Sequence, residues 1–245
     1  MTLACTDKNP ETQQTEPTWG IASLNIDRPI AAGDTLCYHI EMNLDTLSAG
    51  DPLAQSIARV ICDSVLRMTG FSSVQKAMTV YADTMETEWK EWIAEAYNPQ
   101  SEWRETLQYT YTLDGHPIEN GCDSILSYQT TLDCYLGGAH GSYVIMYYNF
   151  DRSTGKLLNI RDLVPAEKEA EVIKAMEAQL CQDWEAKDMT DLKEKTGITA
   201  MGDLYLSNNF TLKGDSITFL FNQYDIAPYA AGLIGITVKA PTPVE

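Results

Sequence analysis

Hydrophobic and polar residues alternate along much of this chain with the period of a β-strand. Between residues 36 and 44, tyrosine, isoleucine, methionine and leucine alternate with histidine, glutamate and asparagine, which indicates a strand with one buried and one polar face. Strands are predicted over residues 23–30, 36–44, 105–113, 126–134, 143–150, 210–212, 217–222 and 232–239. Asp114 and Gly115 are predicted to form the turn after the third strand.

Three longer segments repeat apolar residues at intervals of three and four, the period of a helix that buries one face. These helices are predicted over residues 51–70, 73–97 and 165–187. Gly70 and Pro99 follow the first two segments, and both residue types end helices. A further short helical turn is predicted over residues 191–195. The predicted fold class is therefore α+β, with antiparallel sheets and three main helices packed against them.

The chain is predicted to divide into a tether and two folded halves. Residues 1–20 are rich in Pro, Thr, Gln and Glu and carry few apolar side chains, which is typical of a flexible segment. Residues 21–115 are expected to form an N-terminal α+β half, and residues 116–245 a C-terminal α+β half. A chain of 245 residues is long enough for one large domain or two small ones, and the two halves are expected to pack as one compact unit.

Acidic residues outnumber basic ones by 35 to 17, which gives a net charge of −18. The excess is spread along the chain, and no stripe of Lys or Arg is available to neutralise phosphates, so nucleic acid is excluded as a partner. An acidic surface repels anionic lipid headgroups and attracts cationic partners. The simpler interpretation, which we favour from the charge alone, is that the acidity only keeps the protein soluble.

Residues 1–5 form a small-residue approach to a cysteine, followed by a polar stretch. This pattern resembles the end of a bacterial lipoprotein signal, in which the cysteine is acylated. On this interpretation residues 1–20 are a signal remnant and tether, Cys5 carries lipid, and the protein meets the membrane through that anchor only. The alternative is a flexible tail with an incidental cysteine. No stretch approaches the roughly 20 apolar residues of a membrane-spanning helix.

Residues 136–143 place three glycines around one histidine and lead into an apolar, tyrosine-rich strand. Glycine reaches positive φ without steric cost, so this segment is predicted to be a tight turn. A loop histidine beside glycines can hold the turn closed through a backbone hydrogen bond, contact a ligand, or act as a base. The candidate ligand-binding residues are His140, Gly138, Gly141, Tyr143 and Tyr147.

No catalytic residue, metal site or cofactor is predicted. A hydrolase built on His140 would need a nucleophile such as Ser142 and an orienting carboxylate such as Asp133 or Asp151. Nothing in the spacing requires that arrangement. His39 and His116 have no metal-binding partner at strand or helix spacing, and the cysteines show no zinc-binding spacing. The chain has 35 acidic residues, so no single pair of carboxylates can be singled out as the catalytic pair of a glycoside hydrolase.

Three segments of the C-terminal half carry a family resemblance. They are residues 137–156, 158–163 and 219–232, which contain Gly-Gly-Ala-His-Gly, Thr-Gly-Lys and Asp-Ile-Ala-Pro-Tyr-Ala-Ala-Gly. Together they resemble the uncharacterised envelope domain that forms the extracellular part of the anti-sigma-V factor and that accompanies the catalytic domain of a peptidoglycan deacetylase. Residues 25–115 resemble the companion N-terminal half, so the resemblance spans most of residues 25–240.

The resemblance implies a non-catalytic binding module in the cell envelope, facing the periplasm or the surface. The anti-sigma-V ectodomain binds lysozyme, a cationic protein, so the expected partner is a lysozyme-like cationic protein or a glycan such as peptidoglycan. Two alternatives stay open. One is a hydrolase that acts on envelope polysaccharide through His140, and the other is a structural lipoprotein subunit.

Overall fold

The computed structural model describes most of the chain. The described residues are 18–30, 36–48, 51, 53–98 and 100–241. They fall into two compact units, an N-terminal unit of residues up to 116 with 130–144, and a C-terminal unit of residues 117–129 with 145 onward. The predicted lipidation site Cys5 and the tether up to residue 17 lie outside the described residues.

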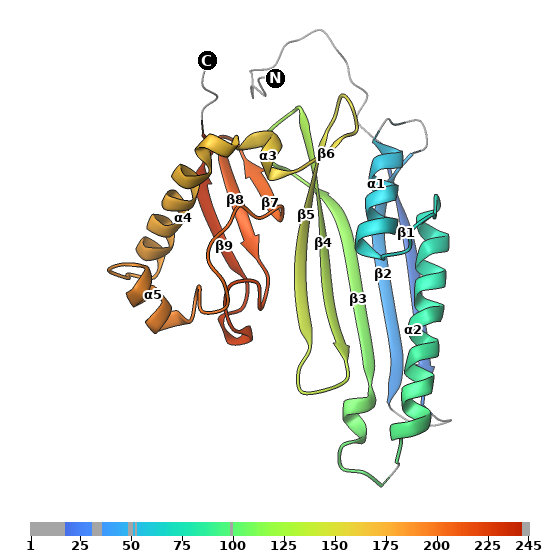
Figure 1. The fold of residues 1–245 in the computed structure, drawn as a ribbon. Helices are drawn as coiled ribbons and strands as arrows, with labels where there is room; N and C mark the ends of the chain where they lie inside the picture. The colour runs from blue at the N-terminus through green and yellow to red at the C-terminus, as the bar shows by residue number, and fades with distance from the viewer. Residues whose placement is uncertain (1–17, 31–35, 49–50, 52, 99, 242–245) are drawn as a thin grey trace. The chain divides into compact units, whose positions relative to one another are not determined.

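The described residues form nine strands in two sheets, together with five α-helices (Figure 1). The first sheet has the order β1-β2-β3-β4-β5-β6 and the second the order β7-β8-β9. The strands are β1 (Trp19–Pro29), β2 (Cys37–Leu47), β3 (Tyr109–Ile118), β4 (Ile125–Leu136), β5 (Ser142–Asp151), β6 (Leu157–Leu158), β7 (Phe210–Lys213), β8 (Ser216–Phe221) and β9 (Ile234–Lys239). This arrangement confirms the α+β class.

Helices α1 and α2 belong to the N-terminal unit, and α3, α4 and α5 to the C-terminal unit. The α-helices are α1 (Ala54–Val60), α2 (Val74–Ala96), α3 (Ile160–Leu163), α4 (Glu169–Asp183) and α5 (Met189–Thr196). Short turns are the π-helical η1 (Ile61–Val65) and the 3₁₀ segments η2 (Arg104–Leu107), η3 (Ala166–Lys168) and η4 (Tyr229–Ala231).

The prediction of three main helices was too low. The two additional helices are α3 and α5, and α5 covers the short turn predicted over residues 191–195. Four residues are too few for α3 to show a helical period in sequence. It is held instead by a capping box, in which the Asn159 side chain accepts from the N–H of Arg161 and the Asp162 carboxylate accepts from the N–H of Asn159.

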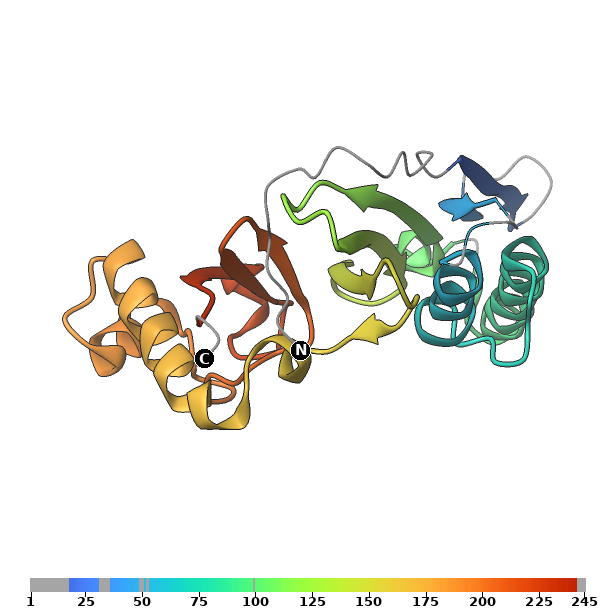
Figure 2. The same ribbon diagram turned by 90° about the horizontal axis from the view of Figure 1, so that it is seen from above.

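Strand β2 carries the core of the N-terminal unit. Tyr38, Ile40, Met42 and Leu44 point to one face and are fully buried. Helices α1 and α2 pack on this face, as Figures 1 and 2 show. The Tyr38 hydroxyl donates to the carbonyl of Ala82 in α2 at 2.6 Å. Burial raises the pKa of this hydroxyl, so it stays a donor at neutral pH and fastens the helix to the sheet.

Two expectations about this sheet were wrong. Strand β3 runs parallel to β2, whereas an antiparallel sheet was predicted. The chain crosses from β2 to β3 through α1 and α2, and such a crossover delivers the next strand in the same direction. Asp114 and Gly115 do not form a turn, because they lie within β3 opposite Asn43 and Leu44. Parallel pairing therefore extends β3 past the expected turn.

Helix α2 agrees with its prediction to within one residue at each end. Ser73 caps its first turn by accepting a hydrogen bond from the N–H of Lys76, at 3.4 Å. Trp89 is 2% exposed, and its indole N–H donates to the carbonyl of Leu107 at 2.9 Å. The aromatic positions predicted on one face of this helix thus serve packing, and they join α2 to the segment before β3.

Buried asparagine side chains join β5 to the second sheet within the C-terminal unit. Asn149 is 1% exposed, accepts from the Ser127 hydroxyl at 2.6 Å and donates to the carbonyl of Phe210 at 2.7 Å. The side-chain oxygen of Asn209 accepts from the backbone N–H of Tyr147 at 2.9 Å. These amides bond backbone groups that have no partner within the strand pairing. They therefore fix the position of β5 against β7 and β8.

Candidate functional site

The glycine corner between β4 and β5, residues 137–141, is a tight turn as predicted. Gly137 and Gly138 have φ of 84° and 92°, a region that residues with a side chain rarely adopt. A Cβ on Gly137 would lie 2.6 Å from the ring of Trp92, whereas a Cβ on Gly138 would meet open space. Gly137 thus allows the close approach of the corner to helix α2, and Gly138 supplies only backbone freedom.

His140 stands at the exposed side of this corner. Its ring nitrogen Nδ1 donates to the carbonyl of the next residue, Gly141, at 2.9 Å. A Cβ on Gly141 would lie 2.9 Å from the carbonyl oxygen of Cys134, so this glycine lets the two hairpin strands approach. The Tyr135 hydroxyl donates to the carbonyl of Gly138 at 2.7 Å. These contacts hold the corner in its conformation.

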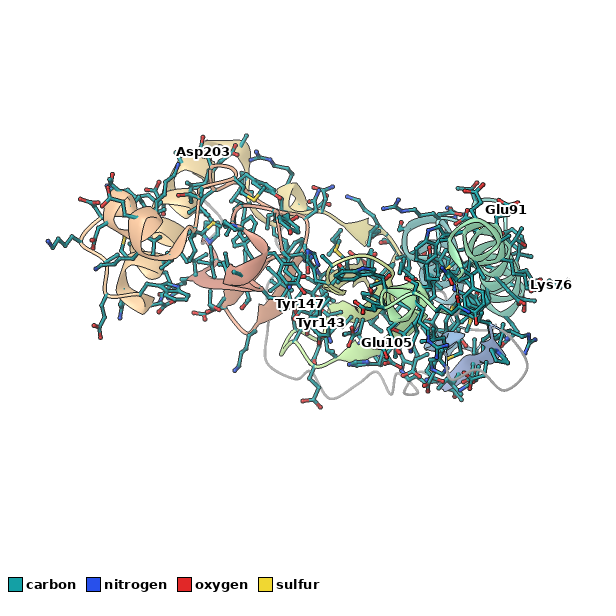
Figure 3. The ribbon with its side chains drawn as sticks, turned by 90° about the horizontal axis from the view of Figure 1, so that it is seen from below. Lys76, Glu91, Glu105, Tyr143, Tyr147 and Asp203 are labelled. Carbon is teal, nitrogen blue, oxygen red and sulfur yellow. The ribbon has the colours of Figure 1, made fainter. Side chains whose placement is uncertain are left out.

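The two tyrosines of the candidate set lie on strand β5 at positions of the same parity (Figure 3). Tyr143 is 39% exposed and belongs to the N-terminal unit with the corner. Tyr147 belongs to the C-terminal unit, where Asn209 holds its backbone N–H. The structure therefore brings His140, Gly138, Gly141 and Tyr143 together in one hairpin, and it places Tyr147 further along the strand.

In the N-terminal unit, α1 and α2 lie on one face of the sheet, and no helix of the described residues lies on the opposite face (Figure 2). We call the outward positions of β1, β2 and β3 on this side the open face. They are Ile21, Ser23, Asn25, Asp27, His39, Glu41, Asn43, Asp45, Thr110, Thr112, Asp114 and His116. Four of these residues are carboxylates and none is lysine or arginine. The open face is therefore acidic along its whole length.

Strand register brings polar groups of the open face into contact. Asp27 lies opposite His39, and its carboxylate is 3.0 Å from the ring nitrogen Nδ1. Asn43 lies opposite Asp114 on β3, and its amide nitrogen donates to that carboxylate at 3.4 Å and to Glu41 at 3.1 Å. The amide thus holds two carboxylates of neighbouring strands on one side of the sheet.

An open hollow of about 400 Å³ lies on the open face. It is lined by Ile21, Asn43, Asp45, Asp114, Gly115, His116 and Thr131. Asp45 and Asp114 supply carboxylate oxygens, Asn43 an amide, and His116 an imidazole. Carboxylates accept hydrogen bonds and favour a cation, so the hollow suits an ammonium or guanidinium group.

Sequence reasoning selected the glycine corner and missed this hollow. The alternation of His39, Glu41 and Asn43 with apolar residues was visible and indicated a polar face on β2. The residues of β3 that lie beside this face could not be predicted, because Asp114 was assigned to a turn. Once β3 is known to run parallel beside β2, the same alternation places Asp114 and His116 next to Asn43 and Asp45.

A second exposed feature is the turn after β8, which carries the third segment of the family resemblance. Tyr224 has a φ of 71°, a strained value for a residue with a side chain. The carboxylate of Asp225 accepts from the N–H of Asn222 at 2.7 Å, and the Asn222 side chain accepts from the N–H of Ile145 at 2.9 Å. The rings of Tyr224 and Tyr229 are 5.9 Å apart. Polar bonds thus hold a tyrosine-bearing turn against β5.

Tyr205 lies in the same unit and is 45% exposed, with its ring edge against Phe221 at 5.3 Å between centroids. Burial of part of the ring, together with the nearby Asp225 carboxylate, raises the pKa of its hydroxyl. The hydroxyl therefore stays protonated at neutral pH and can donate a hydrogen bond to a ligand.

Within the described ranges, no three side chains of His, Cys, Asp or Glu are close enough to hold a metal ion. No disulfide joins any two of the described cysteines, which are Cys37, Cys62, Cys122, Cys134 and Cys181. Each helix in the described part of the chain is too short or too polar to cross a bilayer. The features of the described residues that can bind a ligand are therefore the acidic face of the first sheet and the exposed tyrosines.

Residues 161–240 match the model of a family described as "Protein of unknown function (DUF3298)". The match covers about a third of the chain and lies within the C-terminal unit. A search of curated proteins gave no match.

Two solved structures of DUF3298 family proteins are similar over most of the chain. One comes from Bacteroides fragilis NCTC 9343, with 22% identity, a TM-score of 0.76, and coverage of 91% of this chain and 90% of that one. The other comes from Pseudomonas aeruginosa PAO1, with 14% identity, a TM-score of 0.60, and coverage of 91% of each chain. At these identities the likeness establishes a shared fold.

Proposed function

We propose that this protein is a non-catalytic binding protein of the bacterial cell envelope, lipid-anchored through Cys5, whose ligand is a cationic protein such as lysozyme. The observation that carries the proposal is the net charge of −18 in a chain that matches the DUF3298 family model over residues 161–240. The resemblance to the extracellular part of the anti-sigma-V factor supports the same ligand class. Opposite charge on the two partners speeds their encounter and favours this ligand over anionic ones.

Peptidoglycan fragments are a second candidate ligand. Exposed aromatic side chains favour them, because sugar rings pack against the faces of aromatic rings. Trp103 is 75% exposed and Tyr224 is 50% exposed. The hydrolase alternative gains no support at His140, since that imidazole lies at an exposed turn and donates to the neighbouring carbonyl.

We expect saturable binding of hen lysozyme in isothermal titration calorimetry, weakened at least about tenfold between about 20 mM and about 500 mM NaCl, since salt screens the attraction between exposed charges. Acetylated lysozyme, whose lysines have lost their charge, is the matched control and is expected to bind weakly or not at all. Peptidoglycan fragments are titrated in parallel. Absence of lysozyme binding at low salt, or equal binding of the acetylated form, would refute the proposal.

A further inference from the structure

We infer that the open face of the N-terminal sheet is the docking surface for a basic segment of the protein ligand, with a lysine or arginine side chain seated in the hollow between Asp45 and Asp114. This inference rests on the proposed function and gives it a location. The surface is distinct from the glycine corner, where the sequence placed the candidate ligand contacts.

Apart from the two histidines, His39 and His116, the ionisable side chains of the open face are all acidic. An ordinary solvated sheet face mixes both signs, because opposite charges at cross-strand positions stabilise a sheet and like charges destabilise it. Here β1, β2 and β3 contribute Asp27, Glu41, Asp45 and Asp114, and none of the twelve positions holds lysine or arginine. A surface of this kind keeps a negative potential that a basic partner neutralises.

On the opposite side of the same unit, the chain does neutralise a carboxylate. Glu86 on α2 lies 2.6 Å from the ammonium group of Lys90 and 3.7 Å from the guanidinium of Arg28. Arg28 is on β1, the strand that carries Asp27 and Ile21 to the open face. The positive side chain of this strand is thus directed to the helix side, and the open face gains none from it.

The shape and chemistry of the hollow suit a long basic side chain. Its volume of about 400 Å³ is ample for the end of one long side chain. Asp114 is held by the Asn43 amide, so one acceptor is oriented before a ligand arrives. Asp45 lies opposite Ile21, an apolar residue that is 63% exposed and can cover the methylene stem of a bound lysine or arginine. The lining therefore suits a lysine or arginine side chain, with its cationic group beside the carboxylates and its methylene groups beside Ile21.

The test compares two double variants that remove the same charge from the same unit. Asp45→Asn/Asp114→Asn alters the hollow, and Glu88→Gln/Glu91→Gln alters the exposed side of α2, where Glu91 points away from the sheet (Figure 3). We expect the hollow variant to raise the Kd for hen lysozyme at least about tenfold at low salt, and the helix variant to change it less than about twofold. Circular dichroism melting of both variants verifies that they are folded.

The outcomes separate the two proposals. If the unaltered protein does not bind lysozyme, the proposed function fails and this inference fails with it. If the unaltered protein binds and both variants weaken binding equally, attraction is general and the docking surface is refuted while the proposed function stands. Unchanged binding by the hollow variant refutes the docking surface in the same way.

Discussion

Gly137→Ala is expected to lower the free energy of unfolding by about 3 kcal/mol, because it adds left-handed backbone strain and forces Trp92 out of place. Gly138→Ala has the same backbone strain without the contact, and we expect a loss of about 1 kcal/mol. Urea unfolding, monitored by tryptophan fluorescence and circular dichroism, measures both values. The adjacent glycine thus serves as the matched control.

The difference in unfolding free energy between these two variants tests whether the glycine corner has a structural role. If the close approach of Gly137 to helix α2 matters, the alanine at 137 is the more damaging of the two. Equal losses would show that the contact with Trp92 relaxes freely. Because Gly138 was a candidate ligand contact, a large loss of lysozyme affinity in a stable Gly138→Ala protein would instead return the binding surface to the corner.

Asn149→Ala is expected to destabilise the protein by about 3 kcal/mol, because it leaves the buried Ser127 hydroxyl and the Phe210 carbonyl without this partner. The side chain is 1% exposed, so water cannot readily replace the lost amide. Asn25→Ala, at an exposed position of β1, is the control and is expected to change stability by less than about 0.5 kcal/mol.

The same unfolding measurement decides the matter. A loss below about 1 kcal/mol for Asn149→Ala would mean that the buried amide network contributes little net stability, as many hydrogen bonds do when water competes. In that case packing of apolar side chains, such as the fully buried Phe210 and Phe219, would be left to hold β5 against the second sheet.

The elements that the sequence predicted well are those that bury one face over many residues. Strand β2 shows strict alternation because Tyr38, Ile40 and Met42 all enter the core. Helix α2 shows helical spacing over 23 residues, and Ser73 marks its start. In both cases local propensity and burial favour the same structure, so the pattern of hydrophobic residues alone predicts the element.

The features that sequence reasoning missed depend on pairing between distant segments. Nothing local shows that β3 lies parallel to β2, and a neighbouring Asp and Gly are as typical of a turn as of this strand. Helix α4 begins at Glu169, four residues after the predicted start at Pro165, because a 3₁₀ turn intervenes. The hollow was missed for the same reason, since it exists only where β2 and β3 lie side by side.

The most direct test of the binding surface is carbodiimide labelling of carboxylates, read by mass spectrometry with and without hen lysozyme at low salt. A bound protein shields the carboxylates beneath it from the reagent. We expect reduced labelling of Asp27, Glu41, Asp45 and Asp114 in the complex, and unchanged labelling of Glu91 on α2. Protection of Glu91 with no protection at Asp45 and Asp114 would contradict the account.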